Sequence, residues 1–89
     1  MPKVLTILSV EDHVISVTPY SEEPQDLQAI VIKIANIVGG LENYSDINGE
    51  DITLWWLENR IRNNQFAYIE HNTFEQSYYI EVIEMILLK

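Results

Sequence analysis

A single apolar stripe at helical spacing, between residues 24 and 40, limits the fold of this chain more than any other feature. Counted from Leu27, its members stand at i, i+3, i+4, i+7, i+8 and i+11, which places them on one face of an amphipathic helix. Pro24 suits the first turn, and Gly39-Gly40 supplies the left-handed residue that ends a helix. Such a helix depends on packing its apolar face against another layer. The stripe consists of Leu27, Ile30, Val31, Ile34, Ala35 and Val38.

Segments typical of β-strands flank this helix and can supply that layer. Residues 4–10 and 14–18 are apolar and rich in β-branched side chains, and the polar residues between them predict a β-hairpin. Residues 66–70 predict another strand. Residues 78–88 are ambiguous, because their aromatic and β-branched side chains favour a strand whereas their polar residues are spaced as in a helix. We interpret them as a strand, central in the sheet because both of its faces are apolar.

A second helix is predicted over residues 48–63. Asn48 is a suitable N-cap, and the two acids that follow it interact favourably with the helix dipole. The segment between the two helices, residues 41–47, is predicted to form a loop. The apolar face of the second helix consists of Leu54, Leu57 and Ile61.

The order of these elements predicts the architecture of a single domain over residues 1–89. The order is ββααββ, or ββααβα if the last segment is helical. We therefore expect an α+β fold with two layers, an antiparallel sheet of about four strands with two helices on one face. The other face would be solvated or used for association, and homodimerisation through that face or a sheet edge is a hypothesis.

The chain is strongly acidic but otherwise has the composition of a globular protein. Fourteen Asp and Glu residues face five Lys and Arg residues, for a formal net charge of −9, while 47% of the residues are hydrophobic. Such a negative field repels nucleic acid and anionic membranes and attracts basic partners. No stretch approaches the roughly 20 apolar residues that span a bilayer, and the N-terminus has no signal-peptide pattern. We therefore expect a cytoplasmic protein that contacts neither nucleic acid nor membranes directly.

No pattern in the sequence is typical of a catalytic, metal or cofactor site. There is no cysteine, no serine lies in a Gly-x-Ser-x-Gly elbow, and the three glycines form no phosphate-binding loop. Residues 46–50 resemble part of a calcium loop, but the anchor positions hold Tyr44 and Trp55 instead of carboxylates. The two histidines, His13 and His71, are too few for a catalytic zinc site. The prediction is a protein that is not an enzyme and holds no metal or cofactor.

Two adjacent tryptophans lie on the second predicted helix, where successive residues are about 100° apart. Trp56 is expected to be mostly buried at the margin of the apolar face, and Trp55 to be partly exposed beside Glu58 and Arg62. An exposed tryptophan among charges is typical of an interface anchor. The alternative is a local contact in which the ring of Trp55 lies over the stem of Arg62.

Acidic residues away from the predicted helix starts are the candidates for partner binding. Acids at helix starts have a local stabilising role, whereas the others lie in long stretches without a basic residue. No Lys or Arg occurs between Lys33 and Arg60, or between Arg62 and Lys89. A surface of one sign speeds association with a partner of opposite sign and makes it selective. The predicted partner-binding residues are Glu42, Asp46, Trp55, Glu58, Glu70, Glu75, Glu81 and Glu84.

These observations predict a small acidic, non-enzymatic binding protein. Its partner would be a basic protein, such as a DNA-binding protein or a nuclease, inhibited in the manner of DNA-mimic or immunity proteins of phages and bacteria, which is an analogy of class. One alternative is a structural or regulatory homodimerisation module whose charge serves solubility. Another is a small-ligand-binding protein with a pocket between sheet and helices. The tyrosines that could line such a pocket are Tyr44, Tyr68, Tyr78 and Tyr79.

Overall fold

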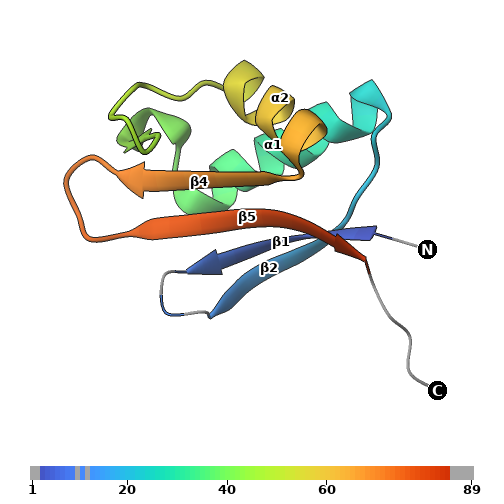
Figure 1. The fold of residues 1–89 in the computed structure, drawn as a ribbon, viewed down its shortest axis with the longest axis horizontal. Helices are drawn as coiled ribbons and strands as arrows, with labels where there is room; N and C mark the ends of the chain where they lie inside the picture. Colours follow the sequence, from blue (N-terminus) through green and yellow to red (C-terminus); the bar gives the residue numbers. More distant parts are fainter. Residues whose placement is uncertain (1–2, 10, 12, 85–89) are drawn as a thin grey trace.

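A five-stranded antiparallel sheet packs against two α-helices in this protein (Figure 1). The computed structural model describes residues 3–9, 11 and 13–84. The strands lie side by side in the order β2-β1-β5-β4-β3, and among the described residues neither helix is long and apolar enough to cross a membrane. The elements in chain order are β1 (Lys3–Ser9), β2 (Val14–Pro19), α1 (Pro24–Val38), the 3-10 turn η1 (Leu41–Asn43), β3 (Tyr44–Ser45), α2 (Leu54–Asn64), β4 (Phe66–His71) and β5 (Ser77–Glu84).

The predicted α+β class is confirmed, but the expected number of strands was wrong. The additional strand, β3, comes from the segment predicted to be a loop and pairs with Glu70 and His71 of β4. The Tyr44 hydroxyl also donates a hydrogen bond to the carbonyl oxygen of Val38, at 2.9 Å, and so ties β3 to the end of α1. A strand of two residues is too short to show a periodic pattern in the sequence. It forms through its pairing with β4. The observed order is therefore ββαβαββ.

The ambiguous C-terminal segment forms a strand as far as Glu84, and residues 85–88 of the prediction lie outside the described residues. β5 lies between β1 and β4, so the predicted central position is confirmed. Hydrogen bonding on both edges stabilises the extended backbone of this segment over the helix that its polar spacing allowed.

The second helix begins at Leu54, later than the sequence predicts. Its N-cap is Thr53 instead of Asn48, because the Thr53 Oγ1 accepts a hydrogen bond from the backbone N–H of Trp56, at 3.0 Å. A threonine side chain in this position satisfies a donor that the first turn of a helix leaves free.

The residues expected to open that helix form a tight turn around Asp46. The Asp46 Oδ1 accepts hydrogen bonds from the backbone N–H groups of Asn48 and Glu50, at 2.8 and 2.9 Å. Gly49 has a φ of 79°, which a right-handed helix does not allow. The prediction that Glu50 and Asp51 lie in the first turn of the helix was therefore wrong.

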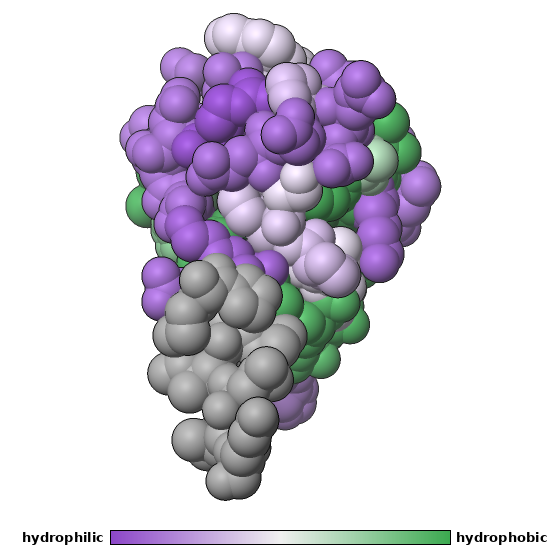
Figure 2. Space-filling view, turned by 90° about the vertical axis from the view of Figure 1, so that its right-hand side faces the viewer, coloured by the Kyte–Doolittle hydropathy of each residue, from purple (hydrophilic) through white to green (hydrophobic). Residues whose placement is uncertain are grey.

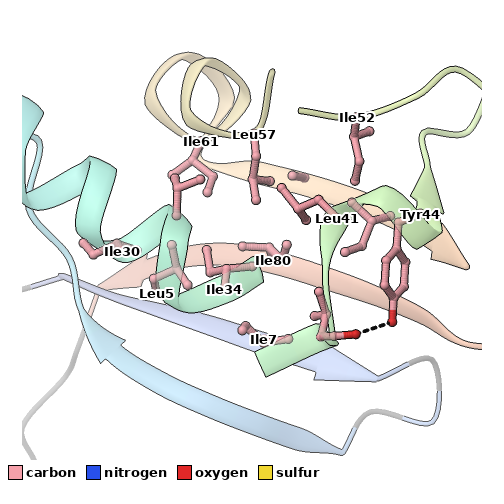
Figure 3. Packing of buried hydrophobic residues seen from close by; sticks show 14 of the residues in the cluster. Leu5, Ile7, Ile30, Ile34, Leu41, Tyr44, Ile52, Leu57, Ile61 and Ile80 are labelled. Atoms are coloured by element: carbon pink, nitrogen blue, oxygen red, sulfur yellow. Dashed lines mark hydrogen bonds between the residues drawn. The ribbon is translucent and has the colours of Figure 1, made fainter. Parts of the chain in front are cut away.

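The apolar stripe of α1 packs into the core, as predicted. Of its members only Ala35 is half-buried and the others are buried, and Gly39, with a φ of 89°, ends the helix. The strands and α2 contribute the other side of the core, and their side chains point toward the stripe (Figure 3). The contributing residues include Leu5 and Ile7 from β1, Ala67 and Ile69 from β4, Ile80 from β5, and Leu57 and Ile61 from α2.

Both helices cover the same face of the sheet, as expected. The core residues of neighbouring strands stand opposite one another, with Ile80 paired to Ile7 on one side and to Ala67 on the other. Because successive side chains of a strand alternate between faces, the residues between them project onto the other side. That side, here called the open face, is covered by neither helix.

Candidate protein-binding surface

Three aromatic side chains gather on the open face where β4 and β5 run side by side. Phe66 and Tyr68 alternate with the core residues of β4, and Tyr79 stands opposite Tyr68 on β5. The ring centroids of Tyr68 and Tyr79 are 5.0 Å apart, and those of Phe66 and Tyr79 are 6.1 Å apart. These three residues are called the aromatic patch. Phe66 is 39% exposed and Tyr68 and Tyr79 are half-buried, so each keeps part of its surface accessible.

Two carboxylates flank the aromatic patch. The hydroxyl of Tyr68 donates a hydrogen bond to Glu70 Oε1, at 2.9 Å, and Glu81 stands opposite Phe66 on β5. The pKa of the Tyr68 hydroxyl is raised: its interaction with Ser77 lowers the pKa, but burial and the hydrogen bond to Glu70 raise it by more. The hydroxyl therefore stays protonated and donates to the carboxyl group of Glu70 beside it.

The open face is free of lysine and arginine in the part of the chain that the structure describes. Lys3 is the only such residue in the described strands, and it shares the alternation of Leu5 and Ile7, which face the helices. Figure 2 shows one end of the molecule, with hydrophilic side chains in its upper part, where the helices lie in Figure 1. Hydrophobic side chains reach the surface lower down. Among the described residues, the strands therefore present apolar and acidic side chains on the open face but no lysine or arginine.

A groove of about 480 Å³ runs along the outer edge of β4 and adjoins the aromatic patch. One wall belongs to the open face, the opposite wall belongs to α2, and the turn after β3 closes one end. We call it the β4 groove. Its lining comprises Phe66, Ala67, Tyr68, Glu70 and Tyr79 from the sheet, Trp56, Arg60 and Asn64 from α2, and Asp46, Ile47 and Asn48 from the turn.

The structure brings some of the predicted partner-binding acids together and separates others. Glu70 and Asp46 line the β4 groove, and Glu81 lies on the same open face. Asp46, however, is only 8% exposed, and its carboxylate is occupied by the backbone of its own turn. Glu58 forms an ion pair with Arg62, at 3.2 Å. The predicted set therefore does not form one continuous surface.

The remaining predicted acids are dispersed over other parts of the molecule. Glu42 lies on η1, Glu75 lies between β4 and β5, and Glu84 ends β5. Glu42, Glu75 and Glu84 are all exposed. Among the predicted acids, Glu70 and Glu81 are the two beside aromatic side chains of the open face.

The two tryptophans differ in exposure in the predicted direction. Trp55 is 74% exposed and Trp56 is half-buried. The guanidinium of Arg60 lies over the ring of Trp56, 5.1 Å from its centroid, whereas Arg62 pairs with Glu58. The alternative of a contact between Trp55 and Arg62 was therefore wrong, because Arg60 takes the stacking role on the neighbouring ring.

The aromatic patch was not foreseen as a unit. Of the four tyrosines proposed for a ligand pocket, Tyr68 and Tyr79 line the β4 groove, whereas Tyr44 and Tyr78 belong to the core or pack against it. A signal was present, since Phe66, Tyr68 and Glu70 alternate with Ala67 and Ile69. The pairing that sets Tyr79 beside Tyr68 depends on strand register, which the sequence does not give.

Within the described residues, no three His, Asp or Glu side chains gather as metal ligands. The His71 Nδ1 accepts hydrogen bonds from the backbone N–H groups of Thr73 and Phe74, both at 3.0 Å, and so organises the β4–β5 connection. His13 lies between β1 and β2, exposed beside Glu11. His71 thus has a structural role in the β4–β5 connection, and His13 is an exposed residue of the β1–β2 connection.

Comparisons with protein families, curated proteins and solved structures gave no match to this chain. The open face and the β4 groove, by their geometry and charge, are therefore the features that bear on the function of this protein.

Proposed function

We propose that this protein is a small acidic, non-enzymatic binding protein that occupies the basic surface of a nucleic-acid-binding protein or nuclease. Its action would be that of an inhibitor, of the DNA-mimic or immunity type found in phages and bacteria. The observation that supports this proposal is the aromatic patch between Glu70 and Glu81, on a face whose described residues include no lysine or arginine.

The chemistry of this face suits arginine and lysine side chains. A guanidinium stacks on an aromatic ring by a cation–π interaction, and a carboxylate at the ring edge accepts its N–H groups in charge-assisted hydrogen bonds. Tyr68 and Glu70 offer the ring and the carboxylate side by side, because the Tyr68 hydroxyl holds the Glu70 carboxylate by a hydrogen bond. Proteins that bind the phosphate backbone carry the matching basic surfaces.

The net charge of the whole chain supports the same partner class. A formal charge of −9 raises the rate of encounter with a basic protein and repels acidic competitors. In this proposal the dispersed acids act through the long-range field, and Glu70 and Glu81 act by direct contact.

Charge reversal on the open face is expected to weaken partner binding strongly. The double variant Glu70→Lys/Glu81→Lys should lower the affinity for the captured basic partner by about 100-fold, since close charge pairs at interfaces contribute several kcal/mol. The measurement is capture from a host lysate on immobilised protein, elution with a salt gradient, identification of the eluted protein, and titration of that protein with each variant.

The matched control is Glu42→Lys/Glu75→Lys, which changes the net charge equally at two exposed positions away from the patch. We expect this control to weaken binding less than about tenfold, through the long-range field alone. Equal loss in both double variants, or wild-type binding that does not change with ionic strength, would contradict the proposal. Circular dichroism establishes that each variant is folded.

The edge strand β2 favours homodimerisation as a second candidate function. Val14, Ile15 and Val17 are between 47% and 60% exposed, and no residue of β2 is charged. An uncovered apolar edge is a template for pairing with a second copy. We expect light scattering after size exclusion to give twice the 10.4 kDa of one chain, and Val17→Lys to restore the monomer. A wild-type monomer at high concentration would exclude this candidate.

A further inference from the structure

We propose that the β4 groove binds an extended segment of the partner as an added β-strand, antiparallel to β4, with basic and apolar side chains in alternation. The inference rests on the proposed function in one respect, namely that the partner is basic. It adds the site, the backbone conformation of the ligand and its side-chain pattern.

In the part of the chain that the structure describes, the backbone of β4 has hydrogen-bonding groups along the groove that pair with neither β3 nor β5. On its inner edge, Gln65 O accepts from Val82 N and His71 N donates to Gln76 O. Residues 65, 67, 69 and 71 therefore direct their N–H and C=O groups toward β5, because these directions alternate along an antiparallel strand. The backbone groups of Phe66 and Tyr68 point the other way, to the edge on which β3 pairs only with Glu70 and His71.

The Asp46 turn is the reason that this edge stays open. β3 runs beside β4 for two residues, with Ser45 opposite Glu70, and a longer β3 would continue past Tyr68. Instead, Asp46 N donates to Glu50 O and Gly49 N donates to Asp46 O, which turns the chain away from β4. The vacated strand position is the β4 groove.

Any segment that fills this position must offer donors and acceptors at strand spacing, which an extended peptide backbone does. Phe66 and Tyr68 provide two N–H and two C=O groups. The site is therefore short, bounded by β3 at one end and by the end of α2 at the other, and takes about four residues.

The two walls of the groove differ, and they define the side-chain pattern of the ligand. The open-face wall holds Glu70 and the rings of Tyr68 and Tyr79, which suit arginine or lysine. The α2 wall holds the face of Trp56 with Arg60 over it, which suits an apolar side chain and repels a cation. Because side chains of an added strand alternate between the walls, basic and apolar residues should alternate.

Charge complementarity favours a basic partner over a second copy of this chain. The exposed edge strand that a second copy could insert, β2, carries no lysine or arginine and so leaves Glu70 without a counter-charge. An arginine opposite Tyr68 in the antiparallel register of β3 would place its side chain on the open face.

The test uses the wild-type protein and two fluorescent peptides of about seven residues. In one, valine and arginine alternate; in the other, the same residues stand in one valine block and one arginine block. We expect the alternating peptide to bind at least about tenfold more tightly in fluorescence anisotropy. Amide hydrogen exchange of Phe66 and Tyr68 should become at least about tenfold slower on binding.

Backbone methylation of the alternating peptide tests the strand pairing itself. In the antiparallel register the arginines stand opposite Phe66 and Tyr68 and share hydrogen bonds with them. N-methylation of the arginines should therefore abolish binding, whereas N-methylation of the valines should leave binding within about threefold. Equal tolerance of both methylation patterns would overturn the proposed pairing.

Three other results would overturn the inference and separate it from the proposed function. If both peptides bind equally without protection of Phe66 and Tyr68, charge alone binds and the proposed function survives. If neither peptide binds but the salt-sensitive partner does, the partner uses another surface. If the two amides become protected as the concentration of the protein alone rises, a second copy fills the groove.

Discussion

Replacement of Leu57 by alanine is expected to lower the free energy of unfolding by about 3 kcal/mol, because it leaves a cavity in a core that cannot close around it. Leu57 is 0% exposed and points from α2 into the core beside Ile61 (Figure 3). A domain of this size has a total stability of about 5–10 kcal/mol, so this one substitution removes a large fraction of it. Urea denaturation followed by circular dichroism measures the change.

The matched control is Leu54→Ala, which removes the same atoms from the same helix. Leu54 is 47% exposed, and we expect its replacement to change the stability by less than about 0.5 kcal/mol. Similar losses for the two variants would mean that α2 is packed differently from the arrangement described above.

The contrast between these leucines also marks what the sequence could predict of α2. Helical spacing correctly placed Leu54, Leu57 and Ile61 on one face, but spacing does not say where the core ends. Leu54 is the first residue of the helix, directly after the Thr53 cap, and so lies beyond the edge of the core. The start itself was mispredicted because Asn48 and Thr53 are both good caps, and the choice depends on the tertiary position of Ile52, which is buried before the helix begins.

Long periodic segments were predictable and short paired ones were not. The spacing of the apolar residues predicted the buried face of α1, and Pro24 and Gly39 predicted its two ends, so that the local signals were consistent with one another. β3 had no comparable signal, because Tyr44 and Ser45 become a strand only through their pairing with β4. The β4 groove depends on where β3 stops, so it could not have been predicted before the register was known.

The candidate site shows the same division. The acidity of the chain predicts a basic partner, which stays a prediction, and Glu70 and Glu81 are among the candidate residues that follow from it. Acidity could not separate these two from Asp46, whose carboxylate closes a turn, or from Glu58, which has an ion-pair partner. To distinguish these acids, the spatial neighbours of each carboxylate must be known. For Glu70 and Glu81 these neighbours are the residues of the aromatic patch, which come together only when β4 pairs with β5.

Tyr44 should make the protein sensitive to alkaline pH. Burial raises the pKa of its hydroxyl from 10.0 to about 12, with the proximity of Tyr78 as a smaller cause. The folded state therefore holds this proton more tightly than the unfolded state. The resulting stabilisation is complete below pH 10, where both states are protonated, and is lost as the pH rises toward 12. We expect a loss of about 2 kcal/mol over that interval.

Tyr44→Phe isolates this contribution. At pH 8 the variant should be less stable than the wild type by about 1–2 kcal/mol, because the carbonyl oxygen of Val38 loses the hydrogen bond drawn in Figure 3. Between pH 10 and pH 12 the wild type should lose stability faster, so that the difference closes or reverses. Repulsion among the carboxylates acts on both proteins equally and cancels in the difference.

Urea denaturation across this pH range gives the curves, and Leu54→Ala, which leaves Tyr44 intact, should run parallel to the wild type. A difference between wild type and Tyr44→Phe that stays constant from pH 8 to pH 12 would show that the Tyr44 proton is held no more tightly in the folded state.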